Sequence, residues 1–359
     1  MRVTRPLYVA RLCALLLGLG VFGPAPVVGA QATKSTTKKG STAKATQAKK
    51  KPTYSANSSA ARKARLARAR RAARAREQAR LRQLRALQEA MTPRFKADAT
   101  GAMVPDVRAA AAIIFDPQTG QVLWEENGQD KRPIASITKV MTAMVFLEDN
   151  PDLSRVVTIQ RGDVYAASTT YLRANERLTV NNLLHLALIA SDNAAARALA
   201  RISHGGSAAF IERMNEKALE LGLESTTFAD PSGLNPENIS SAYDLSRLIS
   251  LAAADDRISP IMRTVEYKVA TSRRKFSIHS TNRLLLGGEV DVMGGKTGFI
   301  SKAGYCLATL LRLPQSNQQI AVVVLGATSN QGRFWETRHL FNWLSQKAAD
   351  ILTKDQEQF

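Results

Sequence analysis

The chain of 359 residues has two parts of very different composition, because its whole formal net charge of +20 lies in its N-terminal part. Between Lys34 and Arg85 there are 18 Lys or Arg side chains and one acid, Glu77. From Ala86 onward the chain has 29 basic and 29 acidic residues and is neutral. Such a charged, low-complexity segment cannot bury enough apolar surface to fold by itself, so a packed core must form later in the chain.

Residues 33–105 are interpreted as a basic low-complexity arm, disordered first and helical afterwards. Residues 33–60 are rich in Thr, Ser, Lys and Ala, with no apolar periodicity, whereas residues 60–90 consist almost entirely of strong helix formers. The arm lacks zinc-finger spacing and interleaved aromatic residues, so nucleic acid is not expected as a partner. Two roles stay open: an inert spacer, or electrostatic attachment to an anionic membrane or wall polymer.

Residues 1–32 resemble a secretory signal peptide. Arginines precede the apolar run LCALLLGLGVF, and small residues follow it, with possible cleavage after Ala30 or Ala32. A retained membrane anchor is the alternative, although the run is shorter than the ~20 apolar residues that span a bilayer. We therefore expect export to the periplasm or cell envelope. Cleavage removes Cys13, so Cys306 cannot form an internal disulfide and is expected to pack as a small apolar residue.

The folded domain is predicted over residues 106–348, followed by a C-terminal tail at 349–359. It begins with AAAIIFDPQTGQVLWEEN, two apolar runs around a turn, which predicts a β-hairpin. Helices are predicted from Ser136, over 179–201 with an interruption, up to Gly222, over 242–254 and in GRFWETRHLFNWLSQKAAD; strands are predicted near Tyr267, at 291–297, in YCLATLLRL and in IAVVVLGA. Strands that flank a mostly helical middle predict an α+β domain with an antiparallel sheet.

The first candidate chemical motif is Ser136-Ile137-Thr138-Lys139. Helical residues three apart lie on one face, so the lysine amine can reach the serine hydroxyl. The same spacing occurs at Ser35/Lys38, Ser41/Lys44 and Ser272/Lys275, but those pairs lie in polar or low-complexity sequence. Only Ser136 opens an apolar helix, whose N-terminus favours an oxyanion and a deprotonated nucleophile.

Two further motifs are Ser191-Asp192-Asn193 and Lys296-Thr297-Gly298. The first interrupts an apolar helical run 55 residues after Ser136, and its structural alternative is a helix N-cap. The second follows a strand-like segment, where a cation and a hydroxyl can hold a carboxylate and a glycine allows close backbone approach. Its structural alternative is a hairpin turn.

Taken in order, the three motifs match the signature of penicillin-binding proteins and β-lactamases. With ASITKVMTA, IASDNAAARALA, FADPSGL, STNRLL, GGKTGF and AGYCLATLLR, residues 106–348 resemble the low-molecular-mass penicillin-binding proteins, the D-alanyl-D-alanine carboxypeptidases and endopeptidases. The resemblance implies a β-lactamase/transpeptidase-like fold with a mostly helical insertion in its antiparallel sheet. It also implies two partners, peptidoglycan stem peptides and covalently bound β-lactams.

The resemblance also implies residue roles. Ser136 corresponds to the acylated nucleophile and Lys139 to its base, whose pKa must be lowered by burial and by the cation of Lys296. Ser191 corresponds to the proton relay to the leaving amine, and Asn193 to the group that binds the substrate amide and tethers Lys139. The remaining implied substrate-binding residues are Lys296, Thr297 and Gly298, with the backbone N–H groups of Ser136 and Phe299 as oxyanion hole and Arg333 as a further carboxylate ligand.

Other hydrolytic chemistries find less support in the sequence. Its four histidines lie outside any Gly-x-Ser-x-Gly elbow, and it has no His-x-x-x-His or Cys-x-x-Cys pair, so no metal or other cofactor is expected. Class A β-lactamases carry a deacylating glutamate four residues before an asparagine. Here Pro231 stands four residues before Asn235, which disfavours a β-lactamase.

Several functions stay open within the resemblance. The favoured one is a serine-type D-Ala-D-Ala carboxypeptidase that trims stem peptides during cell-wall biosynthesis and remodelling. The alternative is an endopeptidase that cuts D-Ala-meso-diaminopimelate cross-links. The shorter layout after the last helix and the KTGF sequence resemble those of the endopeptidase subgroup. A non-catalytic wall-binding protein is disfavoured because all three motifs are intact.

Overall fold

The computed structural model describes residues 59–314 and 316–357, and the chain divides into two units, Met1–Ala67 and Arg68–Phe359. The predicted signal peptide and residues 33–58 of the predicted arm lie outside the described residues. Helix α1 (Ser59–Met91) covers the part of the arm that was interpreted as helical, and from Arg62 onward its side chains are exposed almost throughout. No helix in the described ranges is long and apolar enough to cross a membrane.

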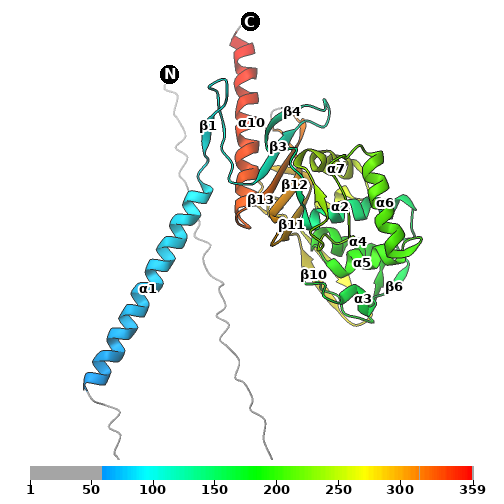
Figure 1. Ribbon diagram of the computed structural model, residues 1–359, viewed down its shortest axis with the longest axis horizontal. Helices are drawn as coiled ribbons and strands as arrows, with labels where there is room; N and C mark the ends of the chain where they lie inside the picture. Colours follow the sequence, from blue (N-terminus) through cyan, green and yellow to red (C-terminus); the bar gives the residue numbers. More distant parts are fainter. Residues whose placement is uncertain (1–58, 315, 358–359) are drawn as a thin grey trace, which may run out of the picture. The chain divides into compact units, whose positions relative to one another are not determined.

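A five-stranded antiparallel sheet forms the centre of the second unit (Figure 1). Its order is β11-β12-β13-β3-β4, so the first hairpin of the domain joins the last strands of the chain. The hairpin turn is held by Asp116, which accepts hydrogen bonds from the backbone N of Gln118 and the hydroxyl of Thr119. The strands are β3 (Ala111–Phe115), β4 (Val122–Glu126), β11 (Asp291–Ile300), β12 (Gly304–Arg312) and β13 (Gln319–Ala327).

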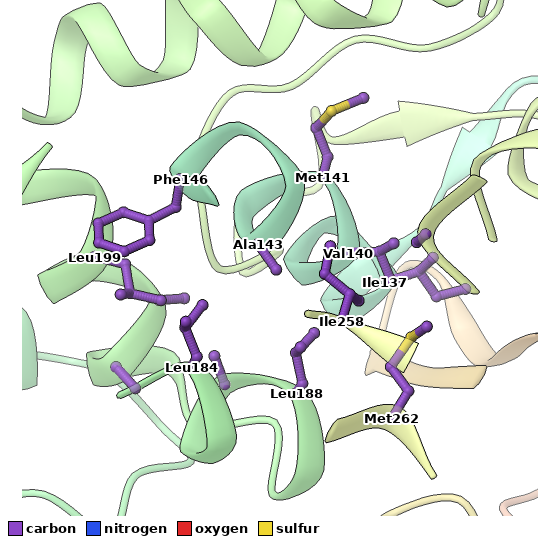
Figure 2. Close-up of a cluster of buried hydrophobic side chains, with 14 of the residues drawn as sticks. Ile137, Val140, Met141, Ala143, Phe146, Leu184, Leu188, Leu199, Ile258 and Met262 are labelled. Atoms are coloured by element: carbon purple, nitrogen blue, oxygen red, sulfur yellow. The ribbon is translucent and has the colours of Figure 1, made fainter. Parts of the chain in front are cut away.

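Most helices pack on one face of this sheet (Figure 1). Helix α2 contributes Val140 and Phe146 to the core under these helices, which also contains Leu184 of α4 and Leu199 of α5 (Figure 2). The helices are α2 (Thr138–Glu148), α3 (Arg161–Val164), α4 (Val180–Ile189), α5 (Asn193–Ile202), α6 (Gly206–Glu220), α7 (Ala242–Ala254) and α8 (Ser259–Met262). The predicted helical insertion in an antiparallel α+β domain is therefore confirmed.

The opposite face of the sheet is covered by α10 (Gly332–Glu357). Along β13, Val323 belongs to the core under the helical insertion, whereas Val322 and Val324 pack with Phe334 and Phe341 of α10. Because successive strand residues point to opposite faces, burial on both faces requires a continuous apolar strand. That explains the unbroken apolar run IAVVVLGA.

The remaining elements are short. They are β1 (Phe95–Ala97) with β2 (Met103–Pro105), β5 (Arg132–Pro133) with β8 (Ile239–Ser240), β6 (Val156–Thr158) with β7 (Arg177–Thr179), β9 (Glu266–Ala270) with β10 (Lys275–His279), the 3-10 turn η1 (Ala135–Ile137) and α9 (Leu284–Gly287).

Two boundaries differ from those predicted. The β1–β2 pair lies within residues 33–105, which were interpreted as disordered and then helical; the ring of Phe95 packs edge-on against His339 of α10. Strands of three residues are too short to show a period, so sequence patterning missed them. Helix α10 also continues to Glu357, beyond Asp350, where the helix predicted from GRFWETRHLFNWLSQKAAD ends. It extends through most of the tail predicted at 349–359, because this segment contains no glycine or proline to stop it.

Candidate active site

Ser136 lies in the tight turn η1 at the beginning of α2. The preceding residue, Ala135, has a positive φ of 50°, a strained conformation for a residue with a side chain. Two glycines hold this turn: a Cβ on Gly233 would lie 2.0 Å from the carbonyl oxygen of Ala135, and one on Gly298 would lie 2.6 Å from that of Ile134. Gly298 thus packs closely against the protein's own turn, and it also lines the cavity in which a substrate backbone is predicted to approach it.

Lys139 projects from the first turn of α2 and is fully buried. Its Nζ donates hydrogen bonds to Ser136 Oγ at 2.9 Å and to Asn193 Oδ1 at 2.6 Å, and a third to the carbonyl oxygen of Ser232. Asn193 is itself held, because its Nδ2 donates to the carbonyl oxygen of Ala167 at 2.7 Å. The lysine amine therefore has a fixed position beside the serine hydroxyl.

Burial lowers the pKa of Lys139 from 10.5 to about 7, since a charged amine is unfavourable away from water. The carboxylates of Asp230 and Asp192 act in the opposite direction, whereas Arg197 adds to the decrease. The sequence had assigned part of this effect to Lys296. Burial lowers the pKa of Lys296, and repulsion by the charges of Lys139 and Arg333 lowers it further.

The second and third motifs meet across the same site. Ser191, with a positive φ of 60°, accepts a hydrogen bond at 2.9 Å from Lys296 Nζ, which also donates to the carbonyl oxygen of Thr297 at 3.0 Å. Thr297 Oγ1 donates to Thr281 Oγ1 at 2.6 Å. The predicted residues thus come together from α2, the α4–α5 junction and β11. Sequence reasoning named STNRLL as part of the resemblance but did not identify Thr281 or Ser232 as site residues.

A cavity of about 410 Å³ opens over these groups. Arg333 forms part of its wall, and its Nη1 donates hydrogen bonds to the carbonyl oxygens of Gly298 and Cys306 at 2.9 and 3.2 Å. Within the described ranges its Nε is buried without a hydrogen-bond partner. The lining residues are Ser136, Ser168, Thr169, Ala190, Ser191, Asn193, Leu234, Thr281, Thr297, Gly298, Phe299, Ile300, Ser301 and Arg333.

Two other predictions concern residues outside the reacting groups. Cys306 is fully buried on β12, as expected for a small apolar residue, and burial raises its thiol pKa to about 11. Asp192 does begin α5 as its N-cap, accepting a hydrogen bond from the backbone N of Ala195 at 2.9 Å. The structural alternative for the Ser191-Asp192-Asn193 motif is therefore also correct, and it coexists with the place of Ser191 and Asn193 in the cavity wall.

The fold and this cluster of serine, lysine and asparagine define the class of serine hydrolases that bind penicillin. A family model described as D-alanyl-D-alanine carboxypeptidase matches residues 98–329. The chain belongs to this family and is a serine-type peptidase with a cell-wall-related function.

Individual relatives agree with that assignment. The chain is 33% identical to a D-alanyl-D-alanine endopeptidase of Escherichia coli, covering 69% of this chain and 81% of the relative. It is also 33% identical to a D-alanyl-D-alanine carboxypeptidase of Bacillus subtilis, covering 63% of this chain and 59% of the relative. Among solved structures, a Streptomyces DD-transpeptidase is similar with 28% identity and a TM-score of 0.63, covering 67% of this chain and 98% of that one.

Proposed function

We propose that the chain hydrolyses D-alanyl-D-alanine-type bonds of peptidoglycan stem peptides through an acyl-enzyme on Ser136. The supporting observation is the 2.9 Å hydrogen bond between Lys139 Nζ and Ser136 Oγ, made by an amine with a pKa of about 7. The neutral amine takes the hydroxyl proton as Oγ attacks the D-alanyl carbonyl carbon. The tetrahedral intermediate then collapses, the C–N bond breaks, and the proton that Lys139 accepted passes to the leaving amine.

The resemblance to penicillin-binding proteins supplies proposed roles for the other groups, and their positions around the cavity are compatible with these roles. Ser191, hydrogen-bonded to Lys296, relays the proton to the leaving amine. Lys296, Thr297 and Arg333 hold the terminal carboxylate of the substrate, and Asn193 binds its amide. The backbone N–H groups of Ser136 and Phe299 form the oxyanion hole; a donor of this kind contributes about 3–4 kcal/mol to transition-state stabilisation.

Water then hydrolyses the ester and releases Ser136. No aspartate or glutamate occurs among the described residues that line the cavity, so the site offers no carboxylate base to activate water against a bulky penicilloyl ester. A β-lactam adduct should consequently persist. This favours a penicillin-sensitive peptidase over a β-lactamase.

The product depends on the substrate side beyond the scissile bond. A carboxypeptidase releases free D-alanine, whereas an endopeptidase releases a second stem peptide. Carboxypeptidase activity remains the first proposal, as the family description suggests. Endopeptidase activity is the second, because the similar E. coli protein is an endopeptidase and Phe299, on the cavity wall, is 49% exposed and can contact a larger leaving group. Digestion of purified muropeptides, read by mass, distinguishes them: pentapeptides lose one alanine, or cross-linked dimers become monomers.

The rate of acylation should rise as pH increases through about 7, because only the neutral form of Lys139 can accept the serine proton. Below that pH the amine is protonated and its lone pair is occupied. The second-order rate constant for acylation by a fluorescent penicillin, measured from about pH 5 to about pH 9, gives this midpoint. A rate that still rises at the upper end of this range without reaching a midpoint, as the ordinary lysine pKa of 10.5 would give, would contradict the assigned base.

We also propose that the chain acts outside the cytoplasm, after export directed by residues 1–32, and that its basic arm attaches it to an anionic surface. Helix α1 carries 11 Lys or Arg side chains against Glu77 and Glu89, and these basic side chains are exposed where described. Attraction to an anionic membrane is worth up to about 1 kcal/mol per basic residue and decays within a Debye length, about 8 Å at physiological salt.

Deletion of residues 33–90 should leave hydrolysis of a small soluble peptide unchanged but weaken sedimentation with anionic vesicles or isolated cell walls. Binding by the intact protein should fall steeply with added salt, because it is electrostatic. Uncharged vesicles serve as the control surface. Equal sedimentation of intact and shortened proteins at low salt would mean that the arm is only a spacer.

A further inference from the structure

Asp192, the middle residue of the second motif, carries a carboxylate with several partners. Thr170 Oγ1 lies 3.0 Å from each of its oxygens and donates to the carboxylate, and the backbone N of Tyr171 donates at 2.6 Å. The backbone N of Ala195 adds the N-cap contact at 2.9 Å. The side chain is fully buried, so these donors replace water around the charge.

These contacts exceed what an N-cap requires. A cap needs one acceptor for the first turn of the helix, and Ser or Asn serves there about as well as Asp. The donors from Thr170 and Tyr171 come instead from a loop whose preceding residues, Ser168 and Thr169, line the cavity. The backbone N of Asn193 links the start of α5 to the same loop by donating to the carbonyl oxygen of Thr169 at 3.0 Å.

The segments joined in this way are locally strained. Ser168 and Ser191 both have positive φ values, 57° and 60°. Such conformations persist when the surroundings hold them, and they are concentrated at functional sites. The carboxylate of Asp192 lies between the two strained segments, next in sequence to Ser191 and Asn193.

Asp192 also contributes to the charge balance at Lys139. Its carboxylate and that of Asp230, in the loop before β8, raise the pKa of Lys139, whereas Arg197 of α5 lowers it. Lys296 faces the same group from β11, and its own pKa is lowered by Lys139. Neutralising residue 192 would therefore move the lysine pKa further down.

We propose that Asp192 is a positioning residue for acylation: its carboxylate ties the cavity-lining loop 168–171 to the start of α5 and thereby fixes Ser191 and Asn193 beside the reacting serine. It touches no substrate atom and acts through these two neighbours. The inference rests on the proposed function of Ser136 as the acylated nucleophile.

Asp192→Asn and Asp192→Ser both keep a good N-cap but lose the second anionic acceptor, and in the Asn variant an amide NH₂ must face a backbone N–H donor. We expect the rate constant for acylation by a fluorescent penicillin to fall about 10- to 100-fold, the scale of a small misplacement of reacting groups. The midpoint of its pH profile should also shift below that of the wild type. Thr170→Val keeps the charge and the cap, so its rate should fall without a shift in the midpoint.

The matched control is Asp163→Asn. Asp163 is likewise buried and accepts hydrogen bonds from Arg201, near the C-terminal end of α5, at 2.9 and 2.8 Å, but it does not line the cavity. This variant should lose stability in thermal unfolding while keeping the acylation rate and midpoint of the wild type.

Penicillin labelling of the wild type distinguishes a failure of the proposed function from a failure of the inference about Asp192. If the wild type takes up no penicillin, the proposed function fails. Thermal unfolding shows whether the two Asp192 variants are folded. If the wild type is labelled and both folded variants keep its acylation rate and pH midpoint, Asp192 is only a helix cap and the inference is overturned. An equal loss of rate in Asp163→Asn would likewise overturn it, because the effect would then be general destabilisation.

Discussion

Replacing Ser136 by alanine is expected to lower the hydrolysis of a D-alanyl-D-alanine peptide by about four to six orders of magnitude, the loss seen when an enzyme nucleophile is removed. Among the described hydrogen-bond partners of Lys139 Nζ, the change deletes the one hydroxyl oxygen; the others are the amide oxygen of Asn193 and the carbonyl oxygen of Ser232. The fold should persist, because Lys139 keeps its hydrogen bonds to Asn193 and to the carbonyl oxygen of Ser232. Peptide turnover and thermal unfolding, measured on the same preparation, check both expectations.

The chain supplies a matched control for this experiment. Ser272 and Lys275 repeat the Ser-x-x-Lys spacing at the β9–β10 hairpin, where both residues are exposed. Ser272→Ala should therefore turn over the peptide at the wild-type rate. Full activity in Ser136→Ala, or a comparable loss in Ser272→Ala, would show that the nucleophile has been misassigned.

Replacing Lys139 by arginine is expected to lower acylation and turnover by about 10² to 10⁴, the usual contribution of a general base. A guanidinium keeps its proton at any useful pH and cannot accept one from Ser136. It is also larger than the amine it replaces, which is fully buried with three hydrogen-bond acceptors. Single-turnover acylation by a fluorescent penicillin at neutral pH measures the loss.

Because arginine also strains the packing, a smaller substitution is needed beside it. Lys139→Met removes the amine without adding bulk or charge, so it should be as inactive as the arginine variant while unfolding at a temperature closer to that of the wild type. Lys275→Arg, on the exposed strand β10, is the control and should be fully active. Neutral-pH activity in either Lys139 variant would require another base for Ser136.

Periodicity and motif spacing predicted the elements that carry the site. Residues 242–254 match α7 in both bounds, because Ser241 caps the helix and its apolar residues repeat with the helical period. The order of the three motifs predicted which residues would lie together at the site. The antiparallel sheet and the helices packed on it bring these residues together. Their distances and partners follow from packing, which a linear pattern does not contain.

Backbone groups and short segments were beyond sequence reasoning. The carbonyl oxygen of Ser232 accepts a hydrogen bond from Lys139 and leaves no side-chain signal, and the conformation of Ala135 is set by glycines far away in sequence. The FADPSGL stretch did provide a hint, because Asp230 within it accepts hydrogen bonds from the backbone of Ser232 and of Gly233. Its turn places Gly233 against the nucleophile turn.

The formation of an ester between Ser136 Oγ and the carbonyl group of the substrate is tested most directly by mass spectrometry of the intact protein after exposure to benzylpenicillin. The predicted result is one penicilloyl group per chain, located by peptide mapping on Ser136 and absent from the alanine variant at that position. An unmodified protein, or an adduct on Ser191 or another residue, would contradict the claim.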